Sequence, residues 1–141
     1  MTCEVLLTID GVQRFQNEAP ETTKLVTDGT LRTENGEVLL SYAESELTGM
    51  SGTQTTFRIE PERVTLTRTG AVQSVMVFAV GEEDRSLYDV GVGALMITVR
   101  TERISSNIDE NGGTLEVAYA ISIEDDTAGT IQYRVEARRK T

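Results

Sequence analysis

Three charged residues of this chain fall on the apolar faces of predicted strands. Glu44, Arg68 and Arg103 each continue a run of apolar residues spaced two apart, as Arg68 does after Val64 and Leu66. Because successive strand side chains point to opposite faces, this phase predicts that the charges point inward. A buried arginine needs a carboxylate or a ligand anion as its partner. The alternative is that each charge lies at a strand end, past the core, where it meets water.

The tyrosines are the other polar candidates for an interior site. The chain has four of them, Tyr42, Tyr88, Tyr119 and Tyr133. A tyrosine supplies apolar contact area with its ring and orients a bound molecule with its hydroxyl. We therefore predict a ligand site formed by Arg68, Glu44, Tyr42 and Tyr119, with Arg68 and Glu44 at one mouth of a barrel. The alternative is that the tyrosines are ordinary core and rim residues.

The residue types present argue against most catalytic sites. The chain has no histidine, which removes the Ser-His and Cys-His nucleophile pairs. Its single cysteine, Cys3, cannot form an internal disulfide or replace the usual zinc and iron ligand sets. We predict that the protein is not an enzyme and uses no metal or cofactor. An enzyme built on carboxylate, arginine and tyrosine groups is the least favoured hypothesis.

The net charge limits the expected partners, and the absence of membrane and signal segments limits the expected location. There are 13 basic and 23 acidic residues, a net charge of −10, which disfavours nucleic acid and anionic membranes as partners. The basic residues cluster only at the C-terminus, which we interpret as a solvated tail. No apolar stretch approaches the roughly 20 residues of a membrane helix, and the first residues lack the features of a signal peptide. We therefore expect a cytoplasmic location.

Short blocks of alternating apolar and polar residues, separated by turn residues, run through almost the whole chain. They predict about ten strands, with hairpins at Asn35-Gly36 and Asn111-Gly112-Gly113. Asp10-Gly11 predicts the end of the first strand, residues 13–21 a loop, and residues 44–52 a break with one loose helical turn. Connections are too short for parallel crossovers. We predict an all-β fold: one closed antiparallel meander barrel, a single domain over residues 1–141.

Four segments give the chain a resemblance to a known family. They are Leu40–Glu44, Thr67–Val72, Gly93–Leu95 and Gly112–Tyr119. In this order and spacing they resemble the YwiB-like family of uncharacterised bacterial proteins, a domain of unknown function with a lipocalin-like (calycin) β-barrel. The resemblance covers residues 29–138. It implies a closed barrel of about ten strands in a cytoplasmic setting and implies no established activity.

Two functions from different classes fit these features. The first is a non-enzymatic barrel that binds a small, partly apolar ligand, with Arg68 and tyrosines as polar contacts. The second is a packed structural or interaction barrel that acts through its surface, with a homodimer as its simplest assembly. The interior volume discriminates between them, because a cavity of about 300 Å³ or more favours a ligand and a filled core favours the second hypothesis.

Overall fold

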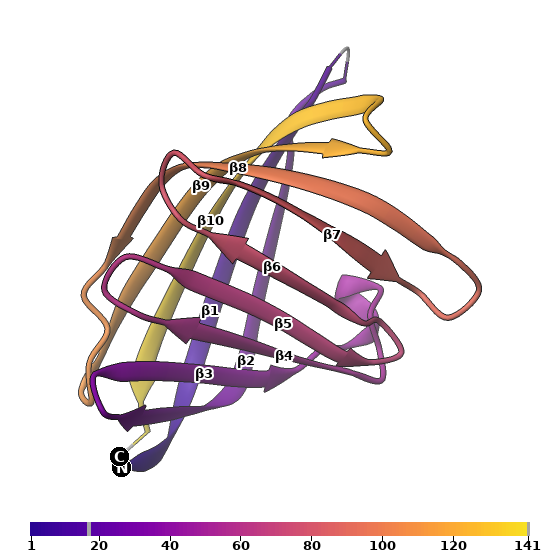
Figure 1. Ribbon diagram of the computed structural model, residues 1–141. Coiled ribbons are helices and arrows are strands. Elements are labelled where there is room, and N and C mark those ends of the chain that lie inside the picture. Colours follow the sequence, from indigo (N-terminus) through magenta and orange to yellow (C-terminus); the bar gives the residue numbers. More distant parts are fainter. Residues whose placement is uncertain (17, 141) are drawn as a thin grey trace.

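Ten antiparallel strands form a nearly closed barrel in the computed structural model (Figure 1), which describes residues 1–16 and 18–140. The strands are β1 (Thr2–Phe15), β2 (Glu21–Glu34), β3 (Glu37–Ala43), β4 (Thr53–Ile59), β5 (Val64–Gly70), β6 (Ser74–Phe78), β7 (Glu83–Asp89), β8 (Ala94–Ser106), β9 (Gly112–Ile123) and β10 (Thr127–Arg139). A single turn of 3-10 helix, η1 (Glu46–Thr48), joins β3 to β4. The described residues include no helix long and apolar enough to cross a bilayer.

The strand order confirms the predicted antiparallel meander. The order is β6-β5-β4-β3-β2-β1-β10-β9-β8-β7, so each strand pairs with its neighbour in sequence except at β6 and β7. The first and last strands pair instead, along Val5–Phe15 of β1, and this brings the two termini together at one end (Figure 1). The first and last strands of the chain are therefore paired, and the gap in the strand pairing, which we call the seam, lies between β6 and β7 in the middle of the chain.

The seam between β6 and β7 is held by few contacts. One isolated antiparallel bridge joins Gln73 to Asp89. Farther along, the carboxylate of Asp84 accepts a hydrogen bond from the backbone N–H of Val77 at 3.1 Å. A side chain thus satisfies a backbone donor that a ladder would otherwise use, which protects the strand edge.

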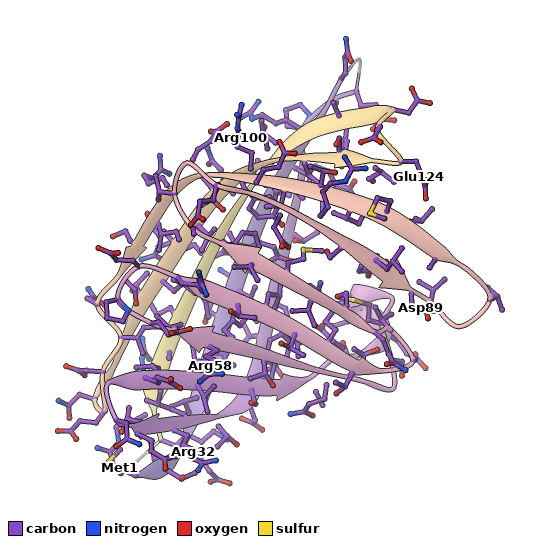
Figure 2. All side chains as sticks on the ribbon, viewed as in Figure 1. Met1, Arg32, Arg58, Asp89, Arg100 and Glu124 are labelled. Atoms are coloured by element: carbon purple, nitrogen blue, oxygen red, sulfur yellow. The ribbon has the colours of Figure 1, made fainter. Side chains whose placement is uncertain are left out.

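The core follows directly from the two-residue alternation. Inward positions of all strands except β7 contribute buried apolar side chains, and the largest fully buried ones include Phe78, Leu7, Leu31, Leu40, Leu66 and Leu115. Phe78 also packs on the ring of Tyr119, with 4.7 Å between ring centroids. The outer faces carry polar and charged side chains such as Arg58 and Arg100 (Figure 2).

The predicted end of the first strand at Asp10-Gly11 is wrong. β1 runs on to Phe15, and Gly11 lies opposite Tyr133 of β10 and Thr23 of β2 in unbroken registers. A glycine inside a strand marks a close approach rather than a stop here, since a Cβ at Gly11 would lie 3.0 Å from the Thr23 hydroxyl. The predicted loop over residues 13–21 is correspondingly shorter; it includes residue 17, outside the described residues.

The predicted inward direction of Arg103 is also wrong. The register of β8 against β9 shifts between Thr101 and Arg103, so Thr101 lies opposite Tyr119 and Arg103 opposite Ala118. This bulge adds one residue and reverses the facing of the side chains beyond it. Thr101 is buried, whereas Arg103 is exposed on the outside.

Strand β2 changes its neighbours at Gly29. It pairs with β1 along nearly its whole length but with β3 only from Thr30 onward, so its first half has a free edge. A Cβ at Gly29 would lie 2.6 Å from Leu7 Cδ1 and 2.7 Å from the Ser41 carbonyl oxygen. Gly29 thus lies at the point where β2 and β3 separate.

We predict that Gly29→Ala destabilises the barrel by about 1–3 kcal/mol, because the added methyl overlaps Leu7 and the Ser41 carbonyl. The matched control is Gly93→Ala, since a Cβ at Gly93 has no atom within 4 Å. Urea unfolding of both variants measures the difference. Equal midpoints for the two variants would contradict the prediction.

Candidate functional site

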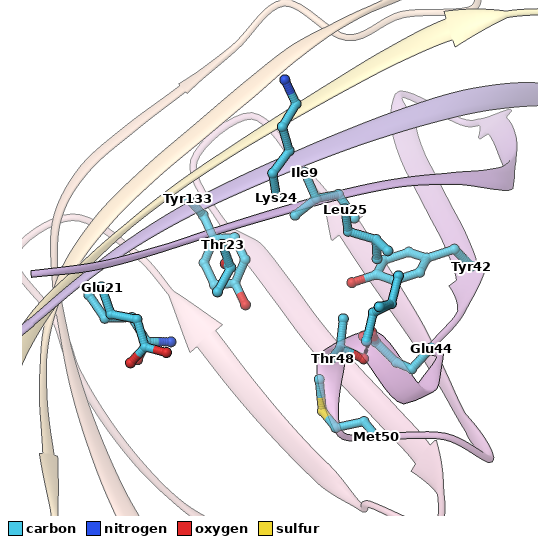
Figure 3. Close-up of a pocket in the computed structure, with 12 residues that line it drawn as sticks. Ile9, Glu21, Thr23, Lys24, Leu25, Tyr42, Glu44, Thr48, Met50 and Tyr133 are labelled. Atoms are coloured by element: carbon cyan, nitrogen blue, oxygen red, sulfur yellow. Dashed lines mark hydrogen bonds between the residues drawn. The ribbon is translucent and has the colours of Figure 1, made fainter.

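A cavity of about 320 Å³ lies between the free half of β2 and η1, and we call it the β2–η1 cavity (Figure 3). Apolar and polar side chains are mixed on its walls. The lining residues are Ile9, Gln13, Glu21, Thr23, Lys24, Leu25, Tyr42, Glu44, Leu47, Thr48, Met50 and Tyr133. Its volume exceeds the roughly 300 Å³ at which small-molecule sites begin.

Local capping interactions shape the β3–β4 connection beside the cavity. The Ser45 side chain accepts a hydrogen bond from the Leu47 N–H at 3.2 Å, which caps the start of η1. Gly49 ends the turn in the left-handed region at φ 76°, and its N–H donates to the Glu46 carbonyl. The turn thereby places Leu47 and Thr48 on the cavity wall. It lies within residues 44–52, where the sequence predicts a break with one loose helical turn, and this prediction is confirmed.

Glu44 is a buried carboxylate whose oxygens are both hydrogen-bonded. Its side chain is 7% exposed. Thr48 Oγ1 donates to one oxygen at 2.9 Å, and Thr55 Oγ1 donates to the other at 2.5 Å. Hydrogen bonds to a charged acceptor offset part of its desolvation cost. The inward direction predicted for Glu44 is correct, and the structure supplies partners that phase alone did not identify.

Arg68 is also buried, with 6% exposure, so its predicted direction is correct too. Within the described residues it forms no ion pair within 4.0 Å, and its Nε lacks a hydrogen-bond partner. Burial acts to lower the pKa of the guanidinium, but the acidic groups of Tyr133, Tyr88, Tyr42 and Glu44 together raise it above its ordinary value. The arginine therefore stays charged.

Arg68 belongs to one row of inward side chains that crosses four strands, and Glu44, directly after β3, is hydrogen-bonded to Thr55 of that row. Tyr42 lies opposite Thr55, Thr55 opposite Arg68, and Arg68 opposite Ser74. Ser74 is 5% exposed, and its Oγ has no hydrogen-bond partner among the described residues. Thr55 and Ser74 were not among the predicted site residues. Their signal was a polar residue in phase with an apolar face, the same signal that identified Arg68.

The tyrosines lie at two depths. Tyr42 and Tyr133 line the β2–η1 cavity, and their hydroxyls point into the space between β2 and η1 (Figure 3). Tyr119 is deeper, beside Phe78 and 3% exposed. Tyr88 donates to the sulfur of Met50 at 3.4 Å. Burial raises the pKa of both Tyr42 and Tyr119, and the Glu44 carboxylate raises that of Tyr42 further, so both phenols stay neutral.

The predicted site residues are thus divided between two layers. Tyr42 and Glu44 line the cavity, whereas Arg68 and Tyr119 are buried and are not among its lining residues. Residues 1–16 and 18–140 bring no three side chains of the metal-ligating types together as a metal site. The arrangement combines a cavity of mixed apolar and polar lining, a hydrogen-bonded carboxylate on its wall and a buried arginine that forms no ion pair among the described residues.

We predict that Thr55→Val lowers the free energy of unfolding by about 1–3 kcal/mol, because it removes the hydroxyl that donates to the buried Glu44 carboxylate. The control is Thr67→Val, on the outer face of β5 and not bonded to Glu44. Chemical denaturation compares the variants. A Thr55→Val protein as stable as the control would show that Glu44 does not depend on this bond.

Comparisons with known proteins agree with this architecture. The model of the DUF1934 family, described as a domain of unknown function, matches residues 7–135. The "Uncharacterized beta-barrel protein YwiB" of Bacillus subtilis (strain 168) is 27% identical over 106 residues, which cover 75% of this chain and 73% of that protein.

A solved structure shows the same fold. The "Crystal structure of ywiB protein from Bacillus subtilis" superposes with a TM-score of 0.85 at 22% identity, covering 99% of this chain and 94% of that one. The resemblance found in the sequence is confirmed. Because the family model extends from β1 to β10, the chain belongs to the DUF1934 family.

Proposed function

We propose that this protein is a non-enzymatic barrel that binds a small, partly apolar ligand in the β2–η1 cavity. The observation that carries the proposal is the cavity itself: about 320 Å³, with Leu25 and Ile9 on its walls beside Tyr42, Tyr133 and Glu44. Small-molecule sites combine such apolar surface with a few placed polar groups.

In this proposal two tyrosine hydroxyls and one arginine are the polar groups that recognise the ligand. Tyr42 and Tyr133 present hydroxyls to the cavity, and the acidic groups of both raise the pKa of the buried Arg68. We also propose a lipocalin-like (calycin) relationship, which agrees with a binding role by fold analogy. We also propose a cytoplasmic, bacterial setting, which the free thiol of Cys3 supports, and no nucleic acid or membrane partner, which the net charge of −10 supports.

An alternative function rests on a separate observation at the surface. Apolar side chains are exposed beside the β6–β7 seam and on the β7–β8 hairpin, which projects from the barrel (Figure 1). They include Val75, Leu87, Val90 and Val92, the last 98% exposed. Exposed apolar groups near a weakly paired strand edge favour an interaction surface. A homodimer formed through this surface is the alternative hypothesis.

The ligand hypothesis predicts that closing the cavity abolishes binding. Thr23 lines the cavity from β2, and Thr22 points to the opposite face of the same strand. We expect wild-type protein to bind the fluorescent probe 1-aminoanthracene at one saturable site. Thr23→Trp should weaken that binding about tenfold or more by filling the cavity, whereas the matched Thr22→Trp should leave it unchanged. Fluorescence titration measures both; no saturable binding to the wild type would overturn the proposed function.

The homodimer hypothesis predicts a mass of twice the chain by light scattering. In that case Leu87→Ser should shift the protein toward the monomer, because it removes an apolar contact at the seam. Val26→Ser is the control, since Val26 is similarly exposed on β2, away from the seam. A wild-type protein that is strictly monomeric rules out this alternative.

A further inference from the structure

We propose that the ligand of this barrel carries one carboxylate group, which binds Arg68 and Ser74 in the interior. This inference rests on the proposed function and adds the chemical class of the ligand. The juxtaposition behind it is a buried arginine opposite a buried serine, with no hydrogen-bond partner for the arginine Nε or the serine hydroxyl among the described residues.

The first step is the missing partner of Arg68. Only 6% of this residue is exposed, its Nε has no hydrogen-bond partner, and no carboxylate of the described residues lies within ion-pair distance. A buried charge left unpaired is strongly destabilising, and nearly all buried polar groups in proteins have partners. An anion bound inside the barrel would supply the missing partner.

The second step is the position of Ser74. It lies directly opposite Arg68 in the β5–β6 ladder, so both side chains leave the sheet on its inner face. Its hydroxyl is buried and unpartnered as well. Two adjacent donors, one of them cationic, match the two oxygens of a carboxylate, which accepts hydrogen bonds and donates none when ionised.

The third step concerns Glu44, the nearest candidate partner from the protein itself. Its two oxygens already accept hydrogen bonds from the Thr48 and Thr55 hydroxyls. Glu44 therefore does not neutralise Arg68 by contact. Its charge still acts on the interior, and it opposes the entry of a doubly charged group such as a phosphate. A singly charged carboxylate fits this balance best.

The fourth step is the path from the cavity. Tyr42 and Tyr133 both line the β2–η1 cavity, and both raise the pKa of the buried Arg68 guanidinium through their acidic groups. An amphipathic acid would place its apolar part among Leu25, Ile9 and the tyrosine rings. Its carboxylate would pass between the tyrosines to reach the interior donors.

The test compares probes that differ only in their head group. Octanoate, octanol and octylamine are titrated against the full chain by displacement of 1-aminoanthracene. We expect octanoate to bind about tenfold or more tightly than octanol, as a charge-assisted hydrogen bond predicts, and octylamine to bind most weakly. Octanol binding as tightly as octanoate overturns the carboxylate and leaves the proposed function standing.

Variants then locate the carboxylate. In Arg68→Met, octanoate and octanol should bind equally, and Ser74→Ala should lose part of the preference. Arg58→Met is the matched control, because Arg58 lies on the outside of the barrel in an ion pair with Glu37 (Figure 2). It should keep the wild-type preference. A preference for octanoate that survives Arg68→Met overturns the inference.

The stability of the variants is measured as well, because an unfolded variant would also lose the preference for octanoate. Removing an unpaired buried charge should leave Arg68→Met at least as resistant to urea as the wild type, so its loss of preference cannot come from unfolding. If 1-aminoanthracene binds but none of the octyl probes displaces it, the carboxylate inference fails alone. If 1-aminoanthracene does not bind either, the proposed function fails.

Discussion

The ladder between β1 and β10 is the constraint on which the rest of the molecule depends. It pairs Val5–Phe15 with residues near the other end of the chain and so converts a meander into a barrel. Both terminal strands gain neighbours on each side, and a terminal strand would otherwise be an exposed edge. The open edges move instead to β6 and β7, where the Gln73–Asp89 bridge and the Asp84 carboxylate hold them.

Separation of β2 from β3 gives this closed structure its cavity. Gly29 packs against Leu7 and the Ser41 carbonyl so closely that a side chain would not fit, and β2 continues from there with one edge free. The capped turn at η1 occupies the other side of the opening. The cavity therefore lies along the part of β2 that has no ladder with β3.

The interior contains two buried charges with different surroundings. Glu44 has two hydroxyl donors, which is the usual state of a buried polar group. Arg68 and Ser74 lack partners within the described residues, although they are neighbours across one ladder. A packed barrel selected only for stability would place apolar side chains at both positions. The unpartnered Arg68 is the observation on which the proposed carboxylate site rests.

Two-residue alternation by itself determined the all-β class, the antiparallel meander and the inward direction of Glu44 and Arg68, because side-chain facing is a local property of a strand. It could not determine the facing of Arg103, since a single inserted residue in β8 reverses the phase. It also could not show that Gly11 continues β1, because that depends on pairing with Tyr133, far away in sequence. The position of the seam, the β2–η1 cavity and the unpaired state of Arg68 are likewise decided by tertiary structure. Each depends on which distant strands lie side by side, and alternation carries no information about that.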